Sequence, residues 1–124
     1  MSAARILAVD DNATIRRALA LRLGARGYEI ITAAHGAEAL EQINREPFDL
    51  VLLDLEMPGV HGHEVLRAIR LRFDQPELPV IVLSATSDPA VIQQTLTLGA
   101  NDYVVKPGDL PVLLARIKSQ LSLK

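Results

Sequence analysis

The sequence predicts an α/β fold: a doubly wound, parallel sheet of five strands with five helices on its two faces. Five short runs of branched apolar residues alternate along the chain with five segments whose apolar residues recur at helical spacing. This alternation is typical of strand–helix units that build a parallel sheet. A length of 124 residues, 49% of them hydrophobic, fits one domain over residues 1–124.

The first strand and helix occupy the N-terminal part of the chain. Residues 6–9 form an apolar run with the pattern of a buried strand. Asn12 can cap the following helix, because its side chain can accept a hydrogen bond from a free backbone N–H, and Gly27 is a suitable C-terminal stop. The apolar stripe of this helix, at i, i+4 and i+8, consists of Ile15, Leu19 and Leu23.

The next two units are organised around the most apolar strand. A strand at 29–32 precedes a helix at 37–44. The strand at 50–54 opens with four branched apolar residues, which is typical of a strand buried on both faces, and it ends on the carboxylate of Asp54. A helix at 62–71 follows. The residues expected to face inward from the two helices are Ala39, Leu40, Ile43, Val65, Leu66 and Ile69.

The last two units complete the sheet. A strand at 79–83 leads to a helix at 89–98, and Gly99 stops that helix. A strand at 103–105 precedes the last helix, which begins near residue 110 and continues a helical pattern into the last residues. This pattern leaves open whether the chain is complete or part of a longer protein. The apolar positions of this helix are Leu110, Leu113, Leu114, Ile117 and Leu121.

Polar side chains follow four of the five strands. Strand one ends in Asp10 and Asp11, strand three in Asp54, strand four in Ser84 and strand five in Lys106. The carboxyl ends of parallel strands lie at one edge of the sheet, so these side chains should converge there. Three neighbouring carboxylates repel one another unless a cation joins them, and oxygen ligands suit Mg²⁺. This set fits phosphoryl transfer onto a carboxylate, with Asp54 as the in-line nucleophile.

The composition excludes several classes of function. A formal net charge of -2 provides no basic footprint for nucleic acid or an anionic membrane. The chain has no cysteine, which excludes disulfides and thiolate metal sites and fits a reducing cytoplasm. No apolar run approaches membrane-spanning length, and no signal peptide precedes the first strand. We therefore expect a cytoplasmic protein that binds neither nucleic acid nor a membrane directly.

The histidines and one group of arginines carry weaker signals. His61 and His63 are two residues apart, and no third ligand at ordered spacing accompanies them, so we expect solvated loop histidines rather than a metal site. The arginines of the helix at 62–71 and the residue after it are expected on a solvated face. These are Arg67, Arg70 and Arg72.

The chain resembles the receiver domain of two-component response regulators, of the chemotaxis type, over almost its whole length. The resemblance rests on four motifs: Asp10-Asp11, Asp54 followed by Met57-Pro58-Gly59, Ser84-Ala85, and Gly99-Ala100-Asn101-Asp102-Tyr103 leading to Lys106-Pro107. It implies a flavodoxin-like sheet with strand order 2-1-3-4-5. It also implies that a histidine-kinase phosphohistidine phosphorylates Asp54, and that the chain is no enzyme beyond its own phosphorylation and dephosphorylation.

The resemblance further assigns the metal ligands. Mg²⁺ would be held by Asp11, Asp54 and the backbone carbonyl of Glu56, with Asp10 in its outer shell.

The same resemblance assigns the phosphoryl and switch residues. Lys106 and Ser84 would bind phosphoryl oxygens, and Tyr103 would turn inward when Ser84 moves. The bond between Lys106 and Pro107 is expected to be cis.

A partner surface is expected on the helix at 89–98 and its neighbours. This helix contains no charged residue, so some of its apolar residues should be exposed. By resemblance, Ile92 and Val112 lie on an outer surface formed by the fourth helix, the fifth strand and the fifth helix, and Arg116 could pair there with Asp102. Expected partners are a sensor histidine kinase or phosphotransfer protein, a downstream protein or covalently linked output domain, and a second copy of the phosphorylated chain.

Other functions have different sequence requirements. A nucleotide-binding enzyme would have a glycine-rich loop after the first strand, and residues 10–14 contain no glycine. A flavodoxin-type flavin site would need a hydroxyl-rich phosphate loop there. An aspartyl-nucleophile phosphatase would match the spacing of Asp54 and Glu56, but usually carries a cap insertion that this short chain lacks. One alternative stays open, an unphosphorylated pseudo-receiver that acts as a protein-binding module.

Overall fold

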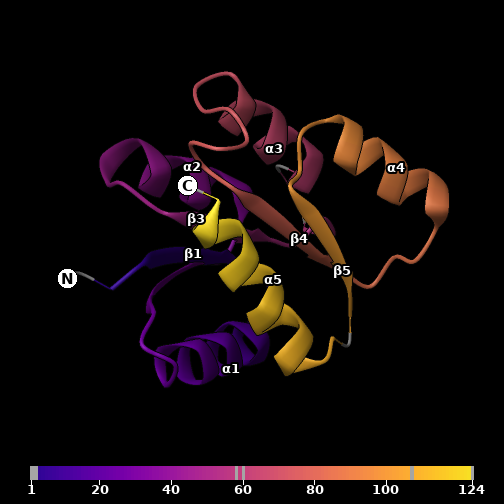
Figure 1. Ribbon diagram of the computed structural model, residues 1–124. Helices are drawn as coiled ribbons and strands as arrows, with labels where there is room; N and C mark the ends of the chain where they lie inside the picture. Colours follow the sequence, from indigo (N-terminus) through magenta and orange to yellow (C-terminus); the bar gives the residue numbers. More distant parts are fainter. Residues whose placement is uncertain (1–2, 58, 60, 107, 124) are drawn as a thin grey trace.

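A single parallel sheet forms the centre of the computed structural model, which describes residues 3–57, 59, 61–106 and 108–123. Five strands lie in the order β2-β1-β3-β4-β5, and every neighbouring pair is parallel (Figure 1). The predicted fold class and strand order are confirmed. The strands are β1 (Arg5–Val9), β2 (Glu29–Ala33), β3 (Leu50–Leu53), β4 (Val80–Ser84) and β5 (Asp102–Val105).

Helices cover both faces of this sheet, as the alternating pattern predicts. Helices α1 and α5 lie on one face and α2 and α3 on the other (Figure 1). Side chains from each pair pack against the sheet, so two apolar clusters form the core. The helices are α1 (Ala13–Gly24), α2 (Gly36–Arg45), α3 (Gly62–Arg70), α4 (Pro89–Thr97) and α5 (Leu110–Ser122). None of the helices in the described ranges is long and apolar enough to cross a membrane.

The ends of the elements differ from the prediction by a few residues. Asn12 caps α1 as predicted, because its side chain accepts a hydrogen bond from the backbone N–H of Ile15. The helix ends at Gly24, and Gly27 lies in the turn before β2, where its φ of 92° suits glycine. The expected cis bond between Lys106 and Pro107 lies outside the described residues, and so does Pro58 of the second motif.

The register of the central strands aligns the polar residues that follow them. Val9 lies opposite Leu53, so Asp10 and Asp54 leave the sheet side by side. The backbone N–H of Asp54 donates to the carbonyl of Val9 at 3.0 Å. At the other side, the N–H of Lys106 donates to the carbonyl of Ser84 at 2.8 Å. The sheet therefore brings the four residues to one edge.

Helix α4 contributes little to the buried core. Thr95 is its only buried residue in the part of the chain that the structure describes, and Leu96 is 41% exposed. The hydroxyl of Thr95 donates to the carbonyl of Val91 at 2.7 Å and forms a hydrogen bond of 2.8 Å with Nε2 of His63 in α3. The prediction that His63 is a solvated loop histidine is therefore wrong, because α4 covers its ring.

Arg70 also differs from its predicted place on a solvated face. Its half-buried guanidinium donates to the carbonyls of Gly99 and Leu78, at 2.8 and 2.9 Å, and to the side chain of Asn101 at 2.9 Å. These acceptors lie in the loops that flank β4 and β5, so Arg70 fastens α3 to the edge of the sheet opposite the polar strand ends. The loop carbonyls explain the position, since they offer partners that the spacing of the arginines does not reveal.

Candidate functional site

Three carboxylates meet at the carboxyl edge of the sheet, as predicted from the strand ends. One carboxylate oxygen from each of Asp10, Asp11 and Asp54 lies within 4.8 Å of the others. Asp10 and Asp54 are buried, and Asp11 is exposed. The group therefore has two carboxylates beneath the protein surface and one that is open to solvent.

Asp10 is oriented by its neighbours. One carboxylate oxygen accepts a hydrogen bond from the backbone N–H of Asn12 at 2.9 Å, and the other accepts from Nζ of Lys106 at 2.6 Å. The Arg16 guanidinium binds the backbone carbonyl of Asp10 at 2.7 Å. These contacts use both carboxylate oxygens, which agrees with a role behind the other two acids.

The environment of Asp54 opposes its ionisation. The net effect of the surroundings is to raise the pKa of this carboxyl from 3.8 to about 6: burial raises it most, the charges of Asp10 and Glu56 also raise it, and Lys106 and the N–H of Glu56 lower it. That N–H donates to a carboxylate oxygen of Asp54 at 3.2 Å. A cation bound between these acids would reduce the repulsion among them and so stabilise the ionised form of Asp54.

Lys106 lies between two acids. Its Nζ is 2.6 Å from a carboxylate oxygen of Asp10 and 3.7 Å from one of Asp54. A single ammonium cannot neutralise three carboxylates. The ammonium group of Lys106 lies closer to Asp10 than to Asp54.

Ser84 is fully buried, and its hydroxyl is engaged in a hydrogen bond with the side chain of Glu56. The Ser84 hydroxyl donates to Oε1 of Glu56 at 2.5 Å, and the hydroxyl of Thr86 donates to the same oxygen at 2.6 Å. The backbone N–H of Ala85 completes the set, 3.4 Å from Oε2. Although partial burial raises the pKa of Glu56, the hydrogen bonds from Ser84, Thr86 and Ala85 lower it more, so this carboxyl is ionised near neutral pH.

The sequence did not predict this role for the Glu56 side chain or any role for Thr86. The prediction for residue 56 concerned only its backbone carbonyl. The available signal was the spacing: an acid two residues after Asp54 and a hydroxyl two residues after Ser84 leave neighbouring strands at the same edge.

Tyr103 is half-buried on β5 and packs against the apolar cluster under α2 and α3. Its hydroxyl donates to the carbonyl of Thr86 at 2.8 Å. Tyr103 is therefore linked through its hydroxyl to the segment that follows Ser84.

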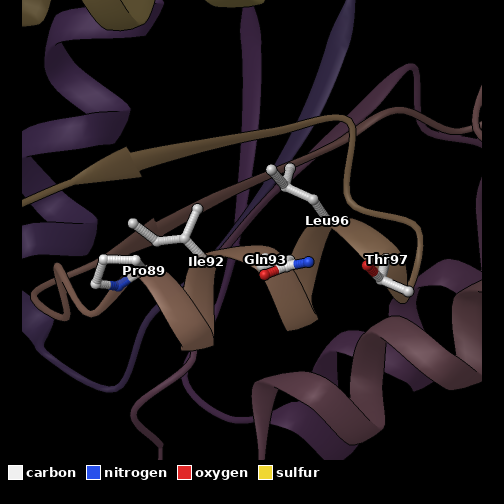
Figure 2. A pocket seen from close by; sticks show the side chains of 5 residues that line it. All are labelled: Pro89, Ile92, Gln93, Leu96 and Thr97. Carbon is white, nitrogen blue, oxygen red and sulfur yellow. The ribbon is translucent and has the colours of Figure 1, made fainter.

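The predicted surface residues lie on α4 and α5. Ile92 is half-buried, and Val112 is 42% exposed. Arg116 forms the expected ion pair with Asp102, at 3.2 Å. Figure 2 shows Ile92 and Leu96 projecting from the same side of α4, where residues of this helix line an open depression of about 530 Å³.

The donor set fits Mg²⁺. Its three acids supply only oxygen ligands, one of them exposed, and Mg²⁺ binds a few carboxylates while it keeps several waters. The described residues around this group include no sulfur ligand and no histidine, which favours a hard cation over zinc.

Comparison with protein families decides the identity of the fold. The family model described as "Response regulator receiver domain" matches residues 6–118. The chain belongs to the response regulator receiver domain family. Receiver domains are the signalling modules of two-component systems, so the resemblance given by the strand-end motifs is confirmed.

Curated relatives agree with this assignment. The chain is 46% identical to a probable transcriptional regulator, ycf27, of Porphyridium aerugineum over 98% of this chain and 49% of the relative. It is 43% identical to the transcriptional regulatory protein KdpE of Mycobacterium tuberculosis over 92% of this chain and 49% of the relative. The chain thus spans about half the length of these relatives.

Solved structures give the same result for the receiver domain. The chemotaxis protein CheY4 of Vibrio cholerae superposes with a TM-score of 0.88 at 33% identity, over 95% of this chain and 98% of that one. TrrA of Thermotoga maritima, solved in complex with Mg²⁺ and BeF, superposes with a TM-score of 0.84 at 38% identity, over 94% of this chain and 98% of that one.

Proposed function

We propose that this receiver, taken as one domain over residues 1–124, accepts a phosphoryl group on Asp54 from the phosphohistidine of a sensor kinase or phosphotransfer protein. A carboxylate oxygen of Asp54 attacks the phosphorus, a P–O bond forms, and the P–N bond to the imidazole breaks. The imidazole nitrogen keeps the electron pair of that bond. The product is an aspartyl phosphate on this chain and a free histidine on the donor.

The observation that carries this proposal is the environment of Asp54. It is a buried acid at the end of the central strand, Nζ of Lys106 lies 3.7 Å from its carboxylate, and Ser84 ends the neighbouring strand β4. Little covalent chemistry is asked of the protein in phosphoryl transfer, because positioning and charge stabilisation provide most of the catalysis. Lys106 would stabilise the phosphoryl oxygens, and the Ser84 hydroxyl would donate to one of them.

A magnesium ion is the cofactor that these residues suit. Asp11, Asp54 and the backbone carbonyl of Glu56 would hold it, with Asp10 behind them, and when bound it would neutralise charge on the acids and the phosphoryl oxygens. The Mg²⁺ and BeF in the TrrA complex support the same assignment for this chain.

The output surface is proposed to be the face formed by α4, β5 and α5. The exposed apolar side chains of Leu96 and Val112 support it, and so does the link from Ser84 through Thr86 to Tyr103 on β5. Phosphorylation would change the binding of a downstream protein, a linked output domain or a second copy at this face. The relatives named as transcriptional regulators support an output in the other half of a longer protein.

The alternative is a pseudo-receiver that binds partners without phosphorylation. Incubation with acetyl phosphate, followed by intact-mass measurement, separates the two. We expect the mass of one phosphoryl group to appear when Mg²⁺ is present and to be absent with EDTA. A protein that stays unmodified at high acetyl phosphate and Mg²⁺, while its fold is intact, would support the pseudo-receiver.

A further inference from the structure

Glu56 connects the segment that carries Asp54 to the segment that carries Ser84 and Thr86, and the proposed phosphorylation involves both segments. Its backbone N–H donates to Asp54 at 3.2 Å, while its side chain accepts from Ser84 and Thr86, at 2.5 and 2.6 Å. Residue 56 thus bridges the end of β3 to the loop after β4. Hydrogen bonds to a charged acceptor are stronger than those between neutral groups, so this bridge restrains the loop.

The bridge uses the hydroxyl that the phosphoryl group needs. Ser84 has one hydroxyl hydrogen, and in this structure it is donated to Glu56. A phosphoryl oxygen on Asp54 would require the same hydrogen. Because the Glu56 carboxylate and the phosphoryl group are both anions, they would also repel each other if both approached the Ser84 hydroxyl. The Glu56 carboxylate and the phosphoryl group therefore compete for one donor.

The Glu56 carboxylate has an open route by which it can move away from Ser84 and Thr86. The Glu56 side chain is exposed although Ser84 is fully buried, so rotation about its side-chain bonds can move the carboxylate into solvent. The backbone N–H can stay on Asp54 during this movement. The loop would follow, because the N–H of Thr86 donates to the Ser84 oxygen at 3.2 Å and the carbonyl of Thr86 accepts from Tyr103.

We propose that Glu56 is a positioning residue that holds Ser84 and Thr86 in the unphosphorylated arrangement, and that phosphorylation requires its carboxylate to leave them. This inference rests on the proposed phosphorylation of Asp54. It adds that the rate of that reaction is set in part by a side chain that belongs neither to the acid cluster nor to the nucleophile. Thr86 acts with Glu56, since it binds the same carboxylate oxygen.

The test compares phosphorylation rates with acetyl phosphate and saturating Mg²⁺ in Glu56→Ala, Thr86→Val and the double variant. We expect each single variant to react roughly three- to tenfold faster than the wild type, because one or more charge-assisted hydrogen bonds no longer have to be broken. The double variant should be no faster than Glu56→Ala, because both changes remove the same contact. Glu64→Ala, an exposed acid in the first turn of α3, is the matched control and should keep the wild-type rate.

Thr86→Val separates this account from simple charge repulsion, since it removes a hydroxyl and leaves every charge in place. Acceleration in Glu56→Ala alone, with Thr86→Val at the wild-type rate, would show that only charge matters and would overturn the inference. Equal rates in all variants would overturn it as well.

Amide hydrogen exchange gives a readout that needs no phosphorylation. Glu56→Ala should speed exchange at the N–H groups of Ala85 and Thr86, and unchanged exchange there would contradict the bridge. A wild-type protein that takes up no phosphoryl group, yet shows this faster exchange in the variant, would refute the proposed function and leave the bridge standing.

Discussion

At the carboxylate of Asp54, burial and the charges of neighbouring acids both oppose ionisation, and among the nearby charges only that of Lys106 favours it. The apolar run that precedes it places this acid at the end of a strand with no exposed residue, and the neighbouring acids oppose its ionisation. These features follow from the sequence, since a buried strand that ends in an acid can be recognised from hydrophobicity alone. The partners of the Glu56 side chain could not be predicted in this way. They depend on the path of the loop after β4, which hydrophobic periodicity does not describe.

The raised pKa of Asp54 predicts a stability effect. The folded protein holds the Asp54 proton up to about pH 6 and the unfolded chain only to 3.8, so stability falls as pH rises between these values and then stays lower. Asp54→Asn cannot ionise. In EDTA near pH 7 it should be more stable by on the order of 2 kcal/mol, a value discounted for the water at the rim of the site. Urea unfolding measures this difference, which should shrink towards pH 4; a less stable variant at both pH values would contradict the expectation.

Metal binding should depend on the side chain of Asp11 more than on that of Glu56. Asp11→Ala removes the exposed carboxylate of the acid cluster, so we expect its Mg²⁺ affinity to fall roughly tenfold or more. Glu56→Ala retains the backbone carbonyl and should keep most of the affinity. Calorimetric titration of both variants checks this prediction. Equal losses would mean that the Glu56 carboxylate binds the metal directly.

Among the elements, α4 shows where sequence patterns stop being informative. The five strands and five helices follow from alternating apolar runs, and their ends are displaced by only a few residues. Helix α4 has no strong apolar face, and a polar contact between Thr95 and His63 joins it to α3. Neither residue type marks such a contact, because threonine and histidine are equally common on solvated surfaces. Arg70 was placed wrongly for the same reason.

The contact of His63 with α4 predicts a pH effect. Burial lowers the pKa of His63 from 6.5, and the charges of Arg67 and His61 on the same side lower it further. The unfolded chain therefore binds this proton more readily, and stability is lost as pH falls through about 6.5. Wild-type protein should lose more stability between about pH 7.5 and 5.5 than His63→Leu does. His61→Leu serves as control and should keep most of the wild-type loss; identical pH profiles for wild type and His63→Leu would refute the prediction.

On the scale of the whole molecule, the sheet edge and the proposed output face are connected through one loop. The strand order places β4 and β5 beside each other, so a change at Ser84 can reach Tyr103 and the exposed face of α4 and α5 without crossing the core. The alternating pattern predicts the parallel sheet, and the resemblance to receiver domains supplies its strand order.

The output face predicts an association that depends on apolar contacts. Glutamate at Ile92 and Val112 would place two charges on this surface, so the double variant Ile92→Glu/Val112→Glu should lose any association that phosphorylation of the wild type produces. Light scattering and pull-down with a linked or downstream partner, each with and without acetyl phosphate, measure it. The phosphorylation rate of the double variant should stay at the wild-type value. Association that persists unchanged would exclude this face as the output surface.

The most direct test of the central claim is the position of the phosphoryl group. Wild-type protein is treated with acetyl phosphate and Mg²⁺, the adduct is reduced with borohydride to fix its position, and peptides are sequenced by mass spectrometry. The account predicts modification at Asp54 alone and none in Asp54→Asn, whose fold should be intact. Modification of Asp10 or Asp11 with Asp54 unmodified would contradict it.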